Sequence, residues 1–357
     1  MNIDLLVGSA PFWRQMQADL RTARRRALVQ TFTFEGDRVG AALGRELRRC
    51  PAPDRQLLVD GYSLLYHNDR WIAGPAWFDR DLRREVLLTH RWVARLRRDG
   101  VGVSFGNPVG PYPSRLVRRN HKKLVVVDDV TYLGGINFSE HNFAWHDMML
   151  RIECPELADC LAEDFEASRR GRPQAMDREV GGIRIVSLNG RGNALGMAPV
   201  LDAVRGARHS IDVQSAYLSH PFTDHLASAR RRGVRVRILM PDRNNKGNLA
   251  RHILQTASRH AFEVYRHPGM SHLKAMLIDD DLLVAGSSNF DFMSYHILEE
   301  LVVLTRDPRA VDAYRARVWT PDLAASRATT PRASLGTRLG HASIRLGASL
   351  AALLAHT

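Results

Sequence analysis

A short motif that occurs twice constrains this chain more than any other feature. The first copy runs from His121 to Asp128 and the second from His272 to Asp279, and both read HxKxxxxD. Four lysines stand against forty-seven arginines in the 357 residues, yet Lys123 and Lys274 fill the Lys position of the two copies. A given His would find this Lys and Asp by chance roughly once in a thousand times. Two copies among 15 His therefore indicate a duplication.

The motifs sit inside longer units that also match each other. Residues 23–34 resemble residues 207–218, and each segment reads as a helix end that runs into a strand. Further elements follow in the same order in each half. We expect strands at 56–59, 101–105, 234–240 and 261–265, and helices at 79–99 and 246–260. This alternation predicts an α/β layer fold, and 45% apolar residues suffice for two buried cores.

Each motif is predicted to form a strand that turns back at its Asp and ends at a glycine. Gly134 and Gly286 mark these ends, and Asn137 and Asn289 follow three residues later. Since His and Lys are two residues apart, they point to one face of the strand. We expect two duplicated domains related by a pseudo-two-fold, with one active site at their interface. The predicted boundaries are 1–175 and 176–320, followed by a basic tail or amphipathic helix at 321–357.

The last segment of the chain is basic and periodic. No acidic residue follows Asp322, whereas leucines recur at helical spacing between Leu335 and Leu353. Such a helix could lie at a membrane interface. It could instead dock its apolar stripe on the second domain, or form a frayed tail.

Composition limits the partners and the compartment. A net charge of +13 points to an anionic partner, which could be nucleic acid, a phosphorylated metabolite or an acidic membrane. Cys50, Cys154 and Cys160 show no spacing typical of a disulfide framework or a metal site. The N-terminus does not resemble a signal peptide, and no run reaches the roughly 20 apolar residues of a membrane span. We expect a cytoplasmic protein, soluble or peripheral at the inner face of the cell membrane.

Two imidazoles, two ammonium groups and two carboxamides at one point would suit phosphodiester chemistry. The reaction needs a nucleophile, a general acid for the leaving group and positive charge for the phosphoryl oxygens. The two His can share the first two roles. The phosphoryl oxygens would be held by Lys123, Lys274, Asn137, Asn289 and Ser287, without a metal or other cofactor.

A nucleophilic His needs an acceptor that keeps the proton on its other ring nitrogen. Asp147 lies 26 residues after His121, and Glu299 lies 27 residues after His272; both begin apolar, strand-like runs. We therefore predict these two as orienting acids. Asp128 and Asp279, a strand's length away from the His, are expected to satisfy N–H groups of their own turns.

With these motifs, the sequence resembles the phospholipase D superfamily over residues 5–320, and especially the short bacterial cardiolipin synthases. The resemblance rests on both HxKxxxxD motifs, Gly134-Gly-Ile-Asn137 and Asp147-Met-Met-Leu-Arg-Ile-Glu153. It implies His, Lys and Asp of each motif as catalytic residues, a phosphohistidine on His121 and proton transfer by His272. It also implies an anionic phospholipid substrate, with phosphatidylglycerol expected, and no nucleic-acid partner.

Other functions remain open at this point. If water replaces the acceptor alcohol, the enzyme is a phospholipase; nucleases share the superfamily, and a degenerate member could bind anionic lipid without catalysis. Aromatic residues between Tyr62 and Phe78 could meet a lipid headgroup layer, stack on bases, or pack on the next helix. One departure concerns the first hairpin. Five residues separate Asp128 from Gly134, against six in the second copy, so its turn should be tighter and Asn137 could be displaced.

Overall fold

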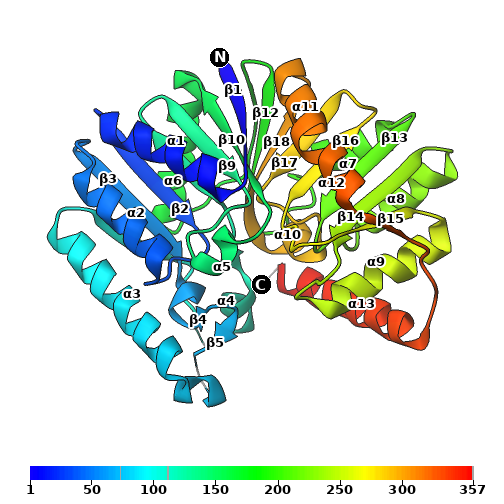
Figure 1. The fold of residues 1–357 in the computed structure, drawn as a ribbon, viewed down its shortest axis with the longest axis horizontal. Coiled ribbons are helices and arrows are strands. Elements are labelled where there is room, and N and C mark those ends of the chain that lie inside the picture. Colours follow the sequence, from blue (N-terminus) through cyan, green and yellow to red (C-terminus); the bar gives the residue numbers. More distant parts are fainter. Residues whose placement is uncertain (73, 111, 356–357) are drawn as a thin grey trace. The chain divides into compact units, whose positions relative to one another are not determined.

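The computed structural model describes residues 1–72, 74–110 and 112–355. The chain divides into two compact units, Met1–Gln174 and Ala175–Thr357. Each unit layers helices on a β-sheet (Figure 1). The predicted duplicated α/β fold is therefore confirmed.

The first unit contains a seven-stranded sheet in the order β1-β10-β9-β8-β2-β3-β6. Strands β2, β3 and β6 run parallel, and the other neighbouring pairs are antiparallel. The strand bounds are β1 Asn2–Val7, β2 Arg26–Thr31, β3 Asp54–Asp60, β6 Gly102–Gly106, β8 Leu124–Val127, β9 Val130–Gly134 and β10 Met148–Glu153. The main helices are α1 Ser9–Thr22, α2 Arg38–Arg49, α3 Arg80–Arg98 and α6 Pro155–Arg169. Shorter elements are η1 Gly61–Leu64, β4 Tyr66–His67, β5 Arg70–Trp71, η2 Gly74–Phe78, α4 Pro113–Val117, β7 Arg119–Asn120 and α5 Glu140–Phe143.

The sheet of the second unit repeats this order and extends it. It follows β11-β12-β18-β17-β16-β13-β14-β15-β19, so that its central seven strands match the first sheet one for one. The strand bounds are β11 Met176–Val180, β12 Ile183–Asn189, β13 Ser210–Ser215, β14 Arg235–Pro241, β15 Glu263–His267, β16 Lys274–Ile278, β17 Leu282–Gly286, β18 Leu298–Thr305 and β19 Arg327–Thr329. The helices are α7 Ala198–Gly206, α8 Phe222–Arg231, α9 Gly247–His260, α10 Phe292–His296, α11 Pro308–Tyr314, η3 Arg315–Trp319, α12 Thr320–Ala325 and α13 Leu335–Ala355.

Local sequence explains most of these elements. The motif strands β8 and β16 are buried along their whole length, as expected for apolar runs in a sheet covered on both faces. Asp37 and Asp79 cap α2 and α3 by accepting backbone N–H bonds at the first turn. The helices predicted at 79–99 and 246–260 are confirmed to within one residue at each end.

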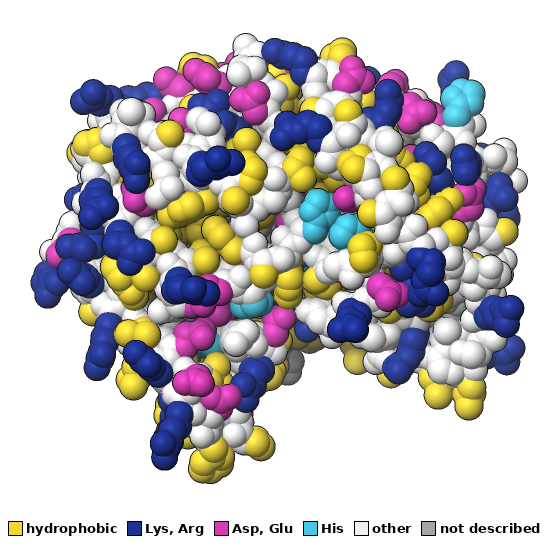
Figure 2. Space-filling view, viewed as in Figure 1, with side chains coloured by type: hydrophobic (Ala, Val, Ile, Leu, Met, Phe, Trp, Pro, Cys, Tyr) yellow, Lys and Arg dark blue, Asp and Glu magenta, His cyan; other side chains and the backbone are white. Residues whose placement is uncertain are grey.

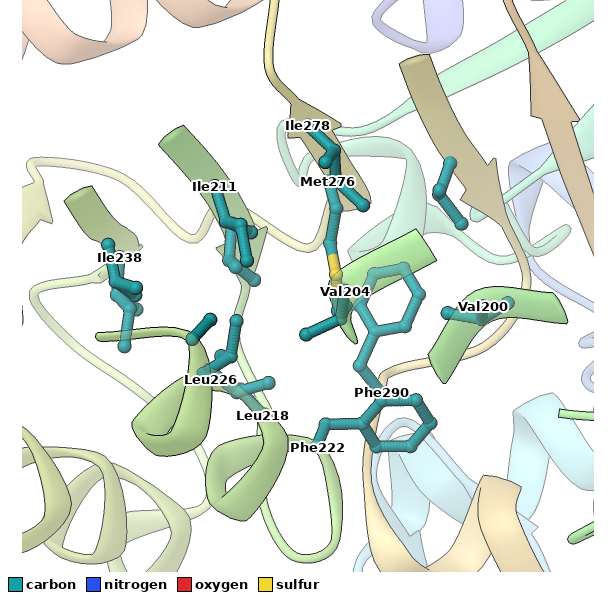
Figure 3. Packing of buried hydrophobic residues seen from close by; sticks show 14 of the residues in the cluster. Val200, Val204, Ile211, Leu218, Phe222, Leu226, Ile238, Met276, Ile278 and Phe290 are labelled. Atoms are coloured by element: carbon teal, nitrogen blue, oxygen red, sulfur yellow. The ribbon is translucent and has the colours of Figure 1, made fainter. Parts of the chain in front are cut away.

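Each unit has its own apolar core. In the second unit, Met276 and Ile278 of β16 pack with side chains from the neighbouring strands and from two helices (Figure 3). These partners include Val200, Val204, Ile211, Phe222, Leu226 and Ile238. The motif strand thus begins at Lys274 and continues directly into the core, which fixes where the motif side chains emerge.

The segment after residue 320 belongs to the second unit. Strand β19 pairs with β15, and α13 packs on α9 and α10. The leucines of α13, however, point away from this contact, and its buried face carries small residues. Those buried residues are Thr337, Gly340, Ile344, Ala348, Ala351 and Ala355. A Cβ at Gly340 would stand 2.6 Å from the Arg251 side chain, so close packing requires small residues on this face. The expectation that the leucine stripe docks on the second domain is wrong.

Candidate active site

In the first unit, His121 and Lys123 lie between β7 and β8. Lys123 is 1% exposed, and its Nζ donates a hydrogen bond of 2.6 Å to the carbonyl oxygen of His121. The ring of Phe32 packs edge-on at 5.4 Å from the imidazole and also lies 5.7 Å from the Lys123 Nζ. One aromatic ring therefore contacts both motif side chains, and the ammonium group is held beside the imidazole.

The second unit repeats this arrangement with shorter contacts. The Nζ of Lys274 lies 2.9 Å from Nδ1 and 3.0 Å from Nε2 of His272 and also donates to the His272 carbonyl oxygen. Both side chains are buried, and the ring of Tyr217 packs edge-on at 5.7 Å from the imidazole. In the second motif the ammonium group contacts the imidazole directly, and in the first both groups contact the Phe32 ring. His121, Lys123 and His272 precede the strands β8 and β16, so the prediction that His and Lys share one strand face is not met in this form.

The asparagines that follow the glycines are also buried. The Nδ2 of Asn137 donates to Asn142 at 3.3 Å, and its Oδ1 accepts a bond of 3.4 Å from Thr31. Asn289 is 7% exposed, and its Oδ1 has no hydrogen-bond partner among the residues that the structure describes. Since buried amide oxygens are normally satisfied, Asn289 has capacity for a further donor.

Asp128 and Asp279 have a structural role, but their partners differ from the prediction. Each carboxylate accepts three backbone N–H bonds of 2.7–3.0 Å from the residues that precede and begin the adjacent strand, 24–26 and 208–210 respectively. Burial opposes ionisation, but these donors outweigh it and hold the pKa of both carboxyls below its usual value. The two carboxylates thus join their hairpins to β2 and β13, and these backbone N–H bonds do not come from their own turns.

The shorter first hairpin changes only its turn. The turn between β8 and β9 has two residues, and that between β16 and β17 has three, so the predicted tighter turn is confirmed. Beyond the turn, the residue after each motif Lys has an equivalent partner. Leu124 pairs with Leu133 in the first unit, and Ala275 pairs with Ala285 in the second. Both hairpins therefore bring the first glycine opposite the motif Lys, and the shortening does not displace Asn137 along the sheet.

Strand register identifies which acid of the second unit corresponds to Asp147. Gly134 pairs with Met149, and Gly286 pairs with Val302. Counting back two residues along each strand gives Asp147 in the first unit and Glu300 in the second. The predicted partner, Glu299, therefore occupies the adjacent position. Because successive side chains of a strand point to opposite faces, Glu299 lies on the face opposite to Glu300.

The glycine positions support the same match. A Cβ at Gly135 would stand 2.3 Å from both carboxylate oxygens of Asp147. Its counterpart Ser287 donates its hydroxyl proton to Glu300, whose second oxygen accepts a 2.7 Å bond from Ser294. Each unit thus has a buried acid next to the residue that follows its first glycine: Asp147 lies beside Gly135, and Glu300 lies beside Ser287. Ser287 was predicted to bind the substrate phosphate. In the structure it donates its hydroxyl proton to Glu300 instead.

Other supporting residues escaped the sequence analysis. Asp60 accepts the Asn120 N–H at 2.6 Å and pairs with Arg119 at 3.1 Å. Lys122 forms a buried ion pair of 2.8 Å with Asp164. These contacts fix the residues on both sides of His121. Asp60 ends a parallel strand, the usual place for site residues in α/β sheets, and this signal could have identified it.

In the second unit, Asp291 also carries a perturbed carboxyl. Its side chain accepts the Ser294 N–H and caps α10. Burial raises the pKa of Asp291 to about 6, and the nearby charge of Glu300 adds to the shift. Two acids therefore lie close together behind the Asn289 segment.

An aromatic cluster leads away from the first motif. Tyr62 stacks on Phe32 at 5.9 Å and contacts Tyr66 and Trp71 at 5.1 and 5.2 Å. Trp71 is 43% exposed. Some of the aromatic residues between Tyr62 and Phe78 thus form a connected surface from solvent to the ring beside His121.

Comparisons with known proteins find similar sequences that are named cardiolipin synthases. A family model described as "Cardiolipin synthase, PLD-like domain" matches residues 200–320. Cardiolipin synthase A of Pseudomonas putida (strain W619) is 28% identical over 99% of this chain and 74% of that protein. A probable cardiolipin synthase of Bacillus subtilis (strain 168) is 26% identical over 70% of this chain and 55% of that protein. The chain spans 66% of another cardiolipin synthase A, from Pseudomonas putida.

Solved structures show the same fold. Phosphatidylserine synthase of Haemophilus influenzae Rd KW20 superposes with a TM-score of 0.73 at 15% identity, covering 99% of this chain and 95% of that one. Polyphosphate kinase of Porphyromonas gingivalis gives a TM-score of 0.59 at 12% identity, covering 98% and 56%. At such identities the likeness concerns the fold alone.

The second unit resembles the phospholipase D-like domain over residues 200–320. The whole chain is similar in sequence to cardiolipin synthases, at 26–28% identity.

Proposed function

We propose that this protein is a phosphatidyltransferase that forms cardiolipin from phosphatidylglycerol. The observation that carries the proposal is that both units keep His, Lys and Asn on matching hairpins, with a buried acid at the same register. A degenerate lipid-binding protein would not need both copies intact. The relationship to cardiolipin synthases supports the same substrate class.

In the proposed first step, a ring nitrogen of His121 attacks the phosphorus of phosphatidylglycerol. The bond from phosphorus to the glycerol oxygen breaks, and His272 gives its proton to the departing glycerol. In the second step, His272 removes a proton from the hydroxyl of a second phosphatidylglycerol. The resulting alkoxide attacks phosphorus, the P–N bond breaks, and His121 is restored.

The remaining residues would stabilise charge and orient the imidazoles. Lys123 and Lys274 would hold the phosphoryl oxygens, and the unpartnered Oδ1 of Asn289 would accept a bond from a substrate hydroxyl. Asp147 and Glu300 would each hold the proton on the distal ring nitrogen of the His in their own unit. Glu299 is not part of this assignment, because the register equates Glu300 with Asp147.

The outer face of α13 suits contact with the lipid surface that contains such a substrate. It exposes a stripe of leucines, and none of the described residues after Asp322 is acidic. The stripe consists of Leu335, Leu339, Leu346, Leu350 and Leu353, which are 52–75% exposed. Arg338 lies along one side of it and would meet anionic headgroups, whereas Arg345 on the same side pairs with Asp224 at 2.8 Å. Among the described residues, no helix is long and apolar enough to cross a membrane.

We propose that this leucine stripe inserts into the interface of an anionic bilayer. Burying the exposed part of Leu346 and Leu350 is worth about 1 kcal/mol each. The double variant Leu346→Ser/Leu350→Ser should therefore bind phosphatidylglycerol vesicles about 30-fold more weakly. The control Leu87→Ser/Leu195→Ser removes two leucines elsewhere that are at least as exposed on average, at 57% and 89%, and should bind normally. Equal binding by both variants, or loss of a dimer instead of vesicle binding, would rule out this role.

The nuclease alternative has less support. Lys and Arg side chains are spread over the drawn face and are mixed with Asp and Glu (Figure 2). Such mixed charge suits a nucleic-acid backbone less well than a uniformly basic surface would.

The test of the reaction supplies phosphatidylglycerol vesicles, with and without EDTA, and identifies the products by mass spectrometry. Cardiolipin and glycerol in both conditions support the proposal, and phosphatidate alone would mean hydrolysis. Single-stranded DNA serves as a parallel substrate, and cleaved DNA with unchanged lipid would overturn the proposal. A phosphorylated peptide containing His121 should be trapped in the wild type and absent in His121→Ala. His90→Ala, an exposed histidine of α3, is the matched control.

A further inference from the structure

A buried cluster of Glu35, His67 and Glu85 lies in the first unit, apart from the two motifs. One ligand-type atom from each residue lies within 4.8 Å of the others. Glu35 follows β2, His67 ends β4 and Glu85 belongs to α3. Glu35 and His67 are each 1% exposed, so the cluster is not a patch of solvated surface acids.

Two atoms in this cluster lack hydrogen bonds. The Nδ1 of His67 and the Oε1 of Glu85 are buried and have no hydrogen-bond partner among the described residues. They face each other at 3.8 Å, which is too long for a hydrogen bond. Unsatisfied polar atoms in a protein interior are unfavourable. Their joint presence indicates a missing partner between them.

The charges also lack balance. Glu35 is buried and Glu85 is half-buried, and among the described residues neither carboxyl forms an ion pair with Lys or Arg. The Nδ1 of His141 lies 3.6 Å from Glu35, and its Nε2 lies 3.8 Å from Asp69. Charged groups in a protein interior need a counter-charge. A cation bound between Glu35 and Glu85 would supply it.

The fold does not need this cluster. The matching segments 23–34 and 207–218 are offset by 184 residues, which makes Ser219 the counterpart of Glu35. The second unit builds the same central sheet without an acid at that position. The cluster is therefore a specific feature of the first unit and not a requirement of the repeated architecture.

We propose that Glu35, His67 and Glu85 bind a divalent transition-metal ion of the Zn²⁺ type. One imidazole nitrogen and two carboxylate oxygens are suitable donors for Zn²⁺. A tetrahedral site with bonds of about 2.0 Å places its ligand atoms about 3.3 Å apart. The facing atoms of His67 and Glu85, 3.8 Å apart, need to approach by about 0.5 Å. Water would complete the coordination, and His141 would hold the second oxygen of Glu35.

The position of the cluster suggests what the ion would do. Tyr66 and His67 are adjacent in β4, so their side chains leave opposite faces of the β4–β5 hairpin. The Tyr66 ring contacts Tyr62 at 5.1 Å, and Tyr62 stacks on Phe32 beside His121. An ion bound to His67 would fix this hairpin against α3. The resulting effect on turnover rests on the proposed function, whereas metal binding itself does not.

The binding test uses the full chain after dialysis against EDTA. We expect one Zn²⁺ per chain by native mass spectrometry and by calorimetry, with Mg²⁺ at least 100-fold weaker. Glu35→Gln/Glu85→Gln should abolish binding, and Asp81→Asn/His90→Ala, which alters an exposed acid and an exposed histidine of α3, should bind as wild type. Absence of stoichiometric Zn²⁺, or binding that survives the double glutamine variant, would overturn the proposal.

Thermal unfolding gives a second readout that remains valid if the double variant folds poorly. Glu85→Gln keeps the size of the side chain and removes one carboxylate ligand, so each protein is compared with itself in the absence and presence of the metal. With saturating Zn²⁺, the wild type should gain stability and the variant should not. If Zn²⁺ shifts both proteins equally, the site is not at Glu85. Failure of cardiolipin formation would leave both metal measurements unaffected, so the two proposals fail separately.

Discussion

Replacing Gly135 by alanine would test the position of the acid behind His121. The new Cβ would stand 2.3 Å from both carboxylate oxygens of Asp147, whereas ordinary contacts begin at 3.4 Å. The carboxylate must therefore move by about 1 Å. This movement breaks the 2.8 Å bond from the Met148 N–H, worth roughly 1.5–3 kcal/mol for a charged acceptor. Overpacking adds roughly 1–3 kcal/mol, so we expect a total loss of about 3–6 kcal/mol.

Activity should fall by more than stability alone explains. A misplacement of about 1 Å in a positioning group costs on the order of 100-fold in rate. The assay compares the free energy of unfolding in urea with the rate of cardiolipin formation under conditions where the variant is folded. Gly206→Ala is the control, because nothing lies within 4 Å of its Cβ and it ends α7. If Gly135→Ala unfolds at the wild-type urea concentration and retains full activity, Asp147 does not occupy this position.

Three further predictions follow from other contacts. Glu300→Gln should lower kcat at least 10-fold, whereas Glu299→Gln should change it less than threefold; a larger loss at Glu299 in the same assay would contradict the register argument. Lys122→Met should cost about 3–5 kcal/mol in urea unfolding because it removes the buried ammonium partner of the Asp164 carboxylate, and adding Asp164→Leu should restore most of this loss. His252 is fully buried, and burial, followed by the charge of His341, lowers its pKa to about 3. Since the unfolded chain binds this proton more readily, stability should fall by about 2 kcal/mol from pH 7 to pH 5, and His252→Phe should remove this dependence; an unchanged slope would refute it.

Much of the site was predictable because it is local in the sequence. His121 and Lys123 are two residues apart, and the structure holds both side chains against the Phe32 ring, although the two residues precede β8. The shorter first turn was also visible in the spacing of Asp128 and Gly134. Such features need only residue spacing and turn length, which a linear sequence expresses directly.

The leucines of α13 show where periodicity misleads. Helical spacing correctly predicted the helix, and an apolar stripe usually marks the buried face. Here the small side chains allow α13 to approach α9 closely, and the leucines remain exposed. Which face docks depends on the shape of the partner surface, and that surface is built from residues distant in the chain.

The sequence by itself determined the duplication, the α/β class and the two motif strands, because each is encoded in repeats and in local alternation. Only the tertiary structure decided that Glu300 and not its neighbour Glu299 matches Asp147, since a shift of one residue in strand register exchanges the two faces. It also brought Glu35, His67 and Glu85 together from three separate elements. Contacts of this kind arise from long-range packing, which no local pattern specifies.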